Sequence, residues 1–236
     1  MKILAIDTSS QSASCALSDD GKLLGEFYEN VKLTHSQTIL PRVQQLLATV
    51  RVPLDQVDLL AVTNGPGSFT GLRIGLSAVK GMAHALGKPC VGISTLEALA
   101  MNLWGQDCLV APVLDARCAQ VYTALFQGGP QGIHRLREDA ALPLDQAEEG
   151  LKNAELPVFL VGDGAQMCYN RWKEHLPQLR LPAPALQYTR AAAVALAAGL
   201  PGHPPVEPQA LAPAYLRLPQ AERELLARQA QIETRR

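Results

Sequence analysis

The chain has 236 residues, of which 47% are hydrophobic and 18% charged, enough for one large domain or two lobes with separate cores. Its formal net charge of -1 provides no overall positive field, which disfavours nonspecific attraction to nucleic acid or an anionic membrane. The five cysteines lack a C-x-x-C pair, so we expect reduced thiols rather than a disulfide framework or a zinc site. The apolar start is too short for a signal peptide, and no segment approaches about 20 uninterrupted apolar residues, so we expect a cytoplasmic protein.

The first half of the chain predicts a mixed sheet with crossover helices. Residues 2–7 read as a buried strand, and the hairpin that follows turns at Asp19-Asp20-Gly21, because acidic residues before glycine favour a tight turn. From Thr34, a possible N-cap alongside Ser36, apolar residues recur at helical spacing as far as Val50. A strand entering a glycine loop, a helix closed by glycine and a further strand are then predicted over 58–68, 72–87 and 90–94.

The second half begins again with strands, after a short helix near 96–103. It only loosely echoes the first half. Strands are predicted over 108–117, 120–129, 133–136 and 157–165, and helices over 169–176 and 189–200. We therefore predict an N-terminal lobe over 1–105, a C-terminal lobe over 106–218 and a charged, solvated tail over 219–236.

A glycine-rich segment over 63–75, TNGPGSFTGLRIG, lies at a junction between strand and helix. Glycines there allow backbone N–H groups to converge at a helix N-terminus, which favours an anion. The segment has neither the G-K-[ST] of a Walker loop nor the G-x-G-x-x-G of a dinucleotide fold, so anion binding and a tight turn are equally good interpretations. The candidate anion or nucleotide residues are Asp7, Thr8, Gly65, Gly67, Ser68, Thr70, Gly71 and Arg73.

Other polar residues also follow predicted strands, at the edge where open α/β sheets bind ligands. Asp7 with the hydroxyls after it could hold a metal-bound phosphate, although a turn is the favoured interpretation. Asp115 and Asp163 end later strands, and Asp115 could simply pair with Arg117. The five histidines have no metal-binding spacing, and neither Ser68 nor Cys90 has an evident base, so we predict no metal site and no catalytic nucleophile.

Five stretches of the chain together resemble the TsaB family. They are ILAIDTSSQSASCAL, LTHSQTILPRVQQLL, the long AVTNGPGSFTGLRIGLSAVKGMAHALGKPCVGISTLEALA, DARCAQVY and the late AYLR. The resemblance spans residues 3–217 and is most specific over 62–99. It implies an α/β protein of the actin-like, Hsp70-like ATPase (ribonuclease H-like) fold, with two lobes that each have a five-stranded mixed sheet flanked by helices.

The resemblance also implies a scaffold function. The related TsaD binds a metal through H-x-E-G-H after the strand equivalent to VGIS, where this chain has TLEAL and keeps only Glu97. It implies a non-catalytic subunit of tRNA threonylcarbamoyladenosine modification, a partner of TsaD and the ATPase TsaE. The chain would meet tRNA only indirectly, with no cofactor of its own and with ATP or ADP possible at the complex interface.

The family's pairing mode implies a dimer surface on the helices over 34–50 and 72–87. Residues of those helices share apolar faces, for which burial in the chain's own core is the default interpretation. The candidate interface residues are Ile39, Leu40, Val43, Gly75, Ala78, Val79 and Met82. A homodimer through the same face is a further possibility. One alternative is an ATP-dependent enzyme of the same fold that holds nucleotide with Asp7, the loop from Gly65 to Gly71 and Gly162-Asp163-Gly164. The other is a glycoprotease-type peptidase, which the missing metal ligands and the lack of a nucleophile disfavour.

Overall fold

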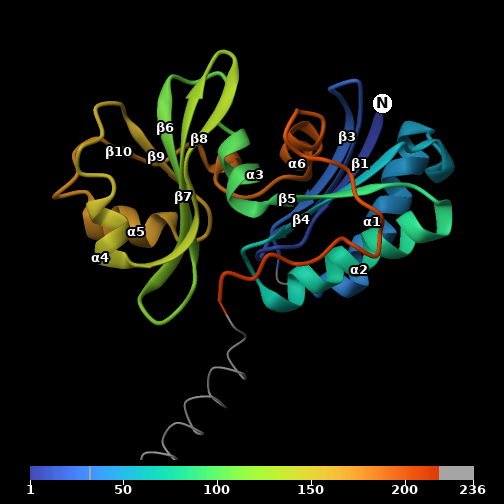
Figure 1. Cartoon of the computed structure of the whole chain (residues 1–236), viewed down its shortest axis with the longest axis horizontal. Coiled ribbons are helices and arrows are strands. Elements are labelled where there is room, and N and C mark those ends of the chain that lie inside the picture. The colour runs from blue at the N-terminus through green and yellow to red at the C-terminus, as the bar shows by residue number, and fades with distance from the viewer. Residues whose placement is uncertain (32, 218–236) are drawn as a thin grey trace, which may run out of the picture.

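The computed structural model describes residues 1–31 and 33–217, which form two lobes, each built on a five-stranded mixed sheet (Figure 1). The first sheet has the order β3-β2-β1-β4-β5. Its strands are β1 (Lys2–Asp7), β2 (Ala13–Asp19), β3 (Lys22–Glu29), β4 (Leu59–Gly65) and β5 (Cys90–Ser94). β2 is antiparallel to its neighbours β1 and β3, whereas β4 pairs parallel with β1 and β5 pairs parallel with β4. The predicted order of elements in this half is confirmed.

The first half of the chain also forms three helices and one 3-10 turn. They are α1 (His35–Val50), α2 (Phe69–Leu86), α3 (Thr95–Met101) and η1 (Leu54–Gln56). Thr34 occupies the N-cap of α1, but its side chain makes no capping hydrogen bond within the described part of the chain. α2 begins three residues before the predicted start because the Ser68 hydroxyl accepts a hydrogen bond from the Gly71 N–H and caps the helix there. Gly87 ends α2 in the left-handed conformation, as predicted.

The second sheet repeats the topology of the first, with the order β10-β9-β6-β7-β8. Its elements are β6 (Cys108–Asp115), β7 (Gln120–Gly129), β8 (Gly132–Pro143), α4 (Leu144–Glu149), β9 (Val158–Val161), α5 (Ala165–Trp172), β10 (Leu179–Arg180) and η2 (Pro184–Leu186). Here too three antiparallel strands come first and two parallel strands follow. The sequence predicts only a loose similarity between the two halves. In the structure, the two sheets have the same strand order. β8 is much longer than predicted, α5 lies one turn earlier, and α4 and β10 were not predicted.

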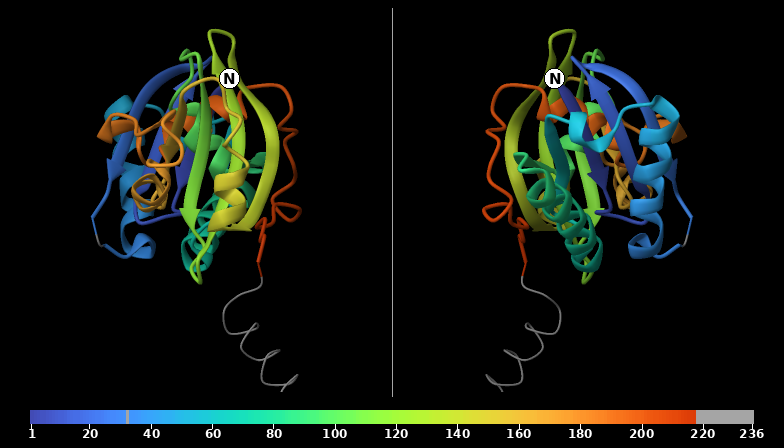
Figure 2. Two further views of the ribbon diagram at one scale, coloured as in Figure 1. Left: turned by 90° about the vertical axis from the view of Figure 1, so that its left-hand side faces the viewer. Right: turned by 90° about the vertical axis from the view of Figure 1, so that its right-hand side faces the viewer.

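The last helix, α6 (Ala191–Ala198), packs on the first sheet and not on the second. Its small alanine side chains allow close approach to β1, β2 and β4, and Ala195 and Ala197 are fully buried there. Figure 1 shows α6 beside β3 and β1, and both views of Figure 2 show the segment after it descending along one edge of the molecule. The predicted C-terminal lobe over 106–218 therefore differs from the structure at its end, because the chain from 191 returns to the first lobe. The predicted tail over 219–236 lies outside the described residues.

Within the described ranges, no helix is long and apolar enough to cross a membrane. Four of the five cysteines are buried, and Cys118 is exposed. Burial raises the pKa of Cys15 and of Cys168 to about 12, so neither thiol is a nucleophile near neutral pH.

Candidate functional site

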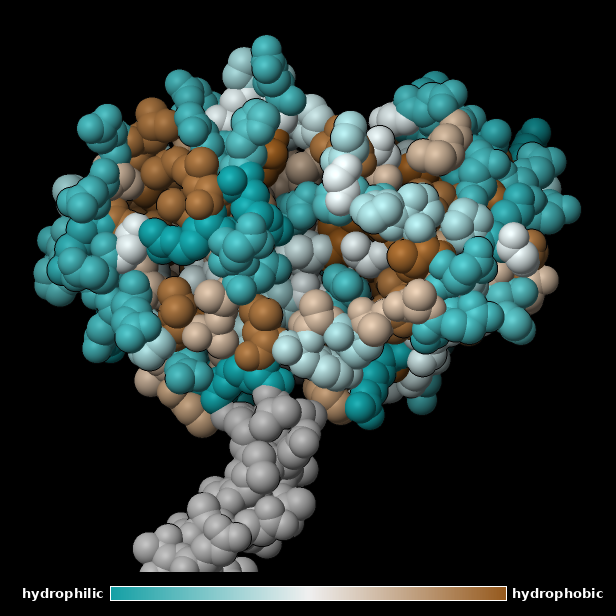
Figure 3. Space-filling model, in the orientation of Figure 1, coloured by the Kyte–Doolittle hydropathy of each residue, from teal (hydrophilic) through white to brown (hydrophobic). Residues whose placement is uncertain are grey.

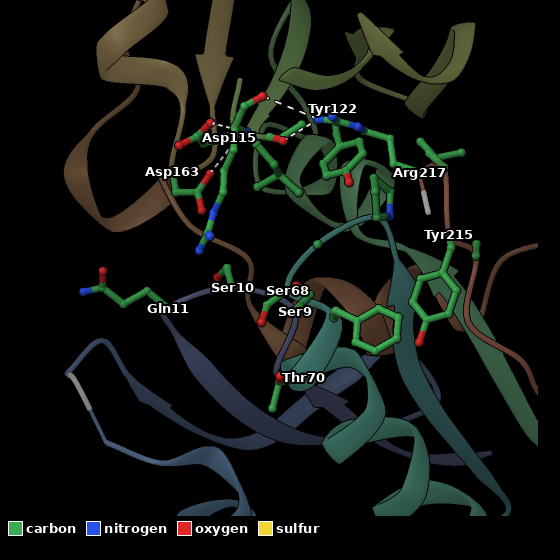
Figure 4. Close-up of a pocket in the computed structure, with 18 residues that line it drawn as sticks. Ser9, Ser10, Gln11, Ser68, Thr70, Asp115, Tyr122, Asp163, Tyr215 and Arg217 are labelled. Atoms are coloured by element: carbon green, nitrogen blue, oxygen red, sulfur yellow. Dashed lines mark hydrogen bonds between the residues drawn. The ribbon is translucent and has the colours of Figure 1, made fainter. Parts of the chain in front are cut away.

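A cleft of about 540 Å³ lies between the two lobes. Figure 4 shows its polar lining: side chains from the turn after β1 and from the start of α2 lie on one side, and side chains from the second sheet lie opposite. The labelled residues of the first lobe are Ser9, Ser10, Gln11, Ser68 and Thr70, and those of the second are Asp115, Tyr122 and Asp163. Tyr215 and Arg217, from the end of the described chain, complete the wall. Equivalent ends of both sheets therefore meet at one polar cavity.

The glycines of the 63–75 segment are required by close packing against the chain itself. A Cβ on Gly71 would lie 2.0 Å from the carbonyl oxygen of Thr8, and one on Gly75 would lie 2.5 Å from the Thr8 hydroxyl. The Thr8 hydroxyl donates to the Gly71 carbonyl at 2.8 Å, which fixes α2 on the turn after β1. Gly65, with a φ of +132°, faces the Ala214 carbonyl, which would lie 2.5 Å from its Cβ. Tight packing thus accounts for these glycines without any ligand.

Two of the N–H groups in this loop already have internal partners. The Ser68 N–H donates to the Ser9 carbonyl at 2.7 Å, and the Gly71 N–H donates to the Ser68 hydroxyl. Of the predicted anion residues, only Gly67, Ser68 and Thr70 line the cleft, whereas Asp7, Thr8, Gly65, Gly71 and Arg73 do not. Anion binding by this loop stays a prediction. Of the residues predicted for it, those that could contact an anion in the cleft are Gly67, Ser68 and Thr70.

Asp7 is the most buried carboxyl group at this end of the first sheet, with no exposed surface. Its Oδ1 accepts hydrogen bonds from the Ser9 hydroxyl and the Thr63 hydroxyl, each at 2.6 Å, whereas its Oδ2 has no hydrogen-bond partner among residues 1–31 and 33–217. Burial raises the pKa of Asp7, and the bonds from Ser9 and Thr63 oppose this rise only in part. Holding the Asp7 carboxylate in its charged form at this buried position therefore lowers the stability of the folded protein.

The substitution Asp7→Asn should make stability less dependent on pH. Because the folded pKa of Asp7 is raised, the wild-type contribution is complete below the unfolded value of 3.8 and is lost as pH rises through the folded value. We expect the free energy of unfolding of the variant, measured in urea from pH 4 to pH 8, to gain on the wild type as pH rises. The exposed Asp20 is the control: the N-terminal ammonium lowers its pKa, so its contribution is lost only as pH falls below about 3.8, and the difference between Asp20→Asn and the wild type should stay nearly constant from pH 4 to pH 8. A difference at position 7 that stays constant with pH would contradict this account.

In the second lobe, Asp115 and Asp163 hold the ends of their strands together. The Asp163 carboxylate accepts from the Asp115 N–H at 3.0 Å, and the Asp115 carboxylate accepts from the Arg117 N–H at 2.7 Å. The anticipated pairing of Asp115 with Arg117 thus uses the backbone of Arg117. Both aspartates also line the cleft, so the turn-forming role does not withdraw them from it.

Glu97 belongs to an ionic network that joins segments of both lobes. Its carboxylate is 2.8 Å from His203 Nε2 and 3.2 Å from the Arg135 guanidinium, which also pairs with Asp139. Burial by itself raises the pKa of Glu97, but the hydrogen bonds and charges of His203 and Arg135 outweigh it and the net pKa is lowered. The part of the chain that the structure describes holds no group of three or more His, Cys, Asp or Glu side chains that could bind a metal ion. His203 and Arg135 lie 106 and 38 residues from Glu97, so no local sequence pattern indicates this network.

A shallow, mainly apolar groove runs along the exposed side of α1 and α2, and we call it the α1/α2 groove. Its walls include Ile39, Leu40, Phe69, Arg73, Ile74 and Ala78. Figure 3, which has the orientation of Figure 1, shows a largely hydrophilic face with apolar residues gathered in separate patches. An apolar groove on such a surface is typical of a contact site for another molecule.

The structure divides the predicted interface residues between the groove and the core. Ile39, Val43, Gly75 and Val79 are buried in the first lobe, in agreement with burial in the chain's own core as the default interpretation, although Ile39 also lines the groove. Met82 is half-buried against the same core. Leu40, which is 45% exposed, and the half-buried Ala78 are the candidates that present surface to the groove.

Comparisons with known proteins agree with this geometry. The family model described as "TsaD: tRNA N6-adenosine threonylcarbamoyltransferase" matches residues 25–225. The tRNA threonylcarbamoyladenosine biosynthesis protein TsaB of Escherichia coli is 37% identical over 74% of this chain and 76% of its own length. Its namesake in Bacillus subtilis is 36% identical over 69% and 71%.

Solved structures show the same relationship. A Pseudomonas aeruginosa protein described as similar to the peptidase YeaZ superposes with a TM-score of 0.77 and 31% identity, covering 92% of this chain and 99% of that one. Component A of the (R)-2-hydroxyglutaryl-CoA dehydratase of Acidaminococcus fermentans, at 13% identity and a TM-score of 0.51, shares the fold alone.

Two repeated five-stranded sheets with a polar cleft between them define a protein of the actin-like ATPase fold. Within that class, the sequence identity and its coverage are decisive. The chain belongs to the TsaB family of tRNA threonylcarbamoyladenosine biosynthesis proteins.

Proposed function

We propose that this chain is a non-catalytic scaffold subunit of tRNA threonylcarbamoyladenosine modification that binds a TsaD protein and acts with TsaE. The observation that carries the proposal is the α1/α2 groove with the exposed Leu40 at its wall. A partner of the same fold carries two equivalent helices, so their apolar faces would complete a four-helix packing across the groove. The proposal implies a cytoplasmic protein that meets tRNA only through its partner.

The surroundings of Glu97 support a non-catalytic role. Residues 95–99 take the place of the metal-binding motif that the family resemblance assigns to TsaD. Glu97, the acidic residue that remains, is already engaged by His203 and Arg135. A carboxylate neutralised by two internal partners is poorly placed to ligate a metal or to accept a substrate proton.

The cleft keeps an ATP-dependent enzyme as a second candidate function. Asp115, Asp163 and residues 66–70 of the glycine loop line a cavity large enough for a nucleotide. Under our proposal any ATP or ADP binds at the interface of the complex, and this subunit needs no cofactor of its own. Saturable ATP hydrolysis by the isolated chain, lost on substitution of a cleft aspartate, would instead favour the enzyme.

The proposal is tested by reconstituting tRNA modification. Threonylcarbamoylation is measured with the adenylate-forming enzyme, TsaD, TsaE and tRNA, with and without this chain. We expect modification to require the chain, while the chain alone hydrolyses no ATP and modifies no tRNA. Modification that proceeds equally without it would refute the scaffold function. A homodimer in solution that dissociates on addition of TsaD would place both partners on the same face.

A further inference from the structure

The last described residues, 211–217, run from the core of the first lobe to the second lobe, and we call them the strap. Leu211 is buried in the core of the first lobe, and its carbonyl accepts a hydrogen bond from Lys80 Nζ at 3.0 Å. The Ala214 N–H donates to the Asn64 carbonyl at 2.7 Å, beside the glycine loop. The start of the strap is therefore fixed to the first lobe by both apolar and backbone contacts.

The far end of the strap is fixed to the second lobe. The Arg217 guanidinium donates to the carbonyls of Ala116 and Arg117, at 2.5 and 3.4 Å. The turn that carries these carbonyls is unusual, since residues 117–119 all have positive φ without being glycine. Such a backbone persists only where its surroundings hold it, and a cationic donor on its carbonyls is one such contact.

Between its two ends, the strap contacts the N-terminal part of α2 through Tyr215. The Tyr215 ring stacks on Phe69 with 4.7 Å between centroids, and Arg73 Nε donates to the Tyr215 hydroxyl at 3.1 Å. The Arg73 guanidinium also lies 3.9 Å above the Phe69 ring. Phe69 and Thr70 line both the cleft and the α1/α2 groove, so the first turn of α2 is a wall common to both.

We propose that the strap sets the shape of the α1/α2 groove according to the angle between the lobes. Tyr215 and Arg217 are two residues apart, a span of at most about 7 Å, so the chain between them has little slack. A rotation that moves the turn at 116–117 away from α2 must break the Arg217 contacts or displace Tyr215 from Phe69. The cleft and the groove are thereby coupled through the contacts of the strap, and Tyr215 and Arg217 act as positioning residues. The inference rests on the proposed binding of TsaD at the groove.

The test compares TsaD affinity, thermal unfolding and interlobe distance in variants of the full chain. Affinity is measured by isothermal titration calorimetry. The distance between spin labels, one in each lobe, is measured by double electron–electron resonance. We expect Arg217→Ala to weaken TsaD binding about tenfold, as for a lost charge-assisted hydrogen bond, and to broaden the interlobe distance distribution. Tyr215→Phe keeps the stacked ring and should weaken binding less than Tyr215→Ala.

Two control variants distinguish a failure of the proposed coupling from a failure of the proposed TsaD binding. Arg180, on β10 at the outer edge of the second lobe (Figure 1), donates to the main-chain carbonyls of Pro177 and Leu179 at 2.7 and 2.6 Å, so Arg180→Ala should leave binding unchanged. Leu40→Asp reports on the groove itself. If Leu40→Asp abolishes binding while Arg217→Ala and Tyr215→Ala bind as the wild type does, the coupling is refuted and the scaffold function stands. If TsaD does not bind the wild type, the proposed function fails first.

Discussion

Replacing Gly71 by alanine is expected to lower the free energy of unfolding by about 3 kcal/mol, the upper range for overpacking a buried site. The new Cβ would lie 2.0 Å from the Thr8 carbonyl oxygen, a backbone atom that cannot turn aside. The loss should outweigh the gain of about 1 kcal/mol that alanine brings to a helix. In a thermal unfolding experiment we expect the midpoint to fall by roughly 6 to 12 °C.

The matched control lies in the same helix. Gly81 is exposed, and a Cβ there meets nothing within 4 Å, so Gly81→Ala should raise stability by about 1 kcal/mol. Opposite signs at the two positions would show that the glycine loop is maintained by packing against the turn after β1. A variant Gly71→Ala as stable as the wild type would contradict the packing account and return the loop to a ligand-binding role.

Placing a charge on the groove is the second substitution with a large expected effect. Leu40→Asp should weaken binding to TsaD about a hundredfold or more, since an apolar contact would be replaced by a carboxylate that loses its water on association. Leu40 is 45% exposed in the isolated chain, so the fold itself should tolerate the change. Co-purification and calorimetry with TsaD measure the effect, and circular dichroism checks that the variant is folded.

Leu136 provides the comparison for this substitution. It is a leucine of similar exposure, 52%, on β8 of the second lobe, so Leu136→Asp should leave TsaD binding intact. Equal loss in both variants would mean that any added charge impairs binding. Full binding by Leu40→Asp would move the partner to another face.

The sequence indicated the glycine loop but not its use. The same glycines are required whether backbone N–H groups receive an anion or a neighbouring chain packs close, because both uses demand the absence of a Cβ. The clash of a Gly71 Cβ with Thr8, 63 residues earlier, is a long-range contact and leaves no local pattern. In the same way, helical spacing identified the apolar faces of α1 and α2, but it could not separate the buried Ile39 from the exposed Leu40.

By itself, the sequence determined the strands of the first sheet, the hairpin and the glycine-capped helix α2, because alternation, helical spacing and turn residues are properties of neighbouring positions. The family was indicated separately, by the resemblance of five stretches of the chain. Only the tertiary structure decided that α6 returns to the first sheet, that Glu97 is held by His203 and Arg135, and that the strap joins the lobes. Each of these depends on contacts between residues far apart in the chain. Their energies become favourable only once both sheets are formed, so no local pattern encodes them.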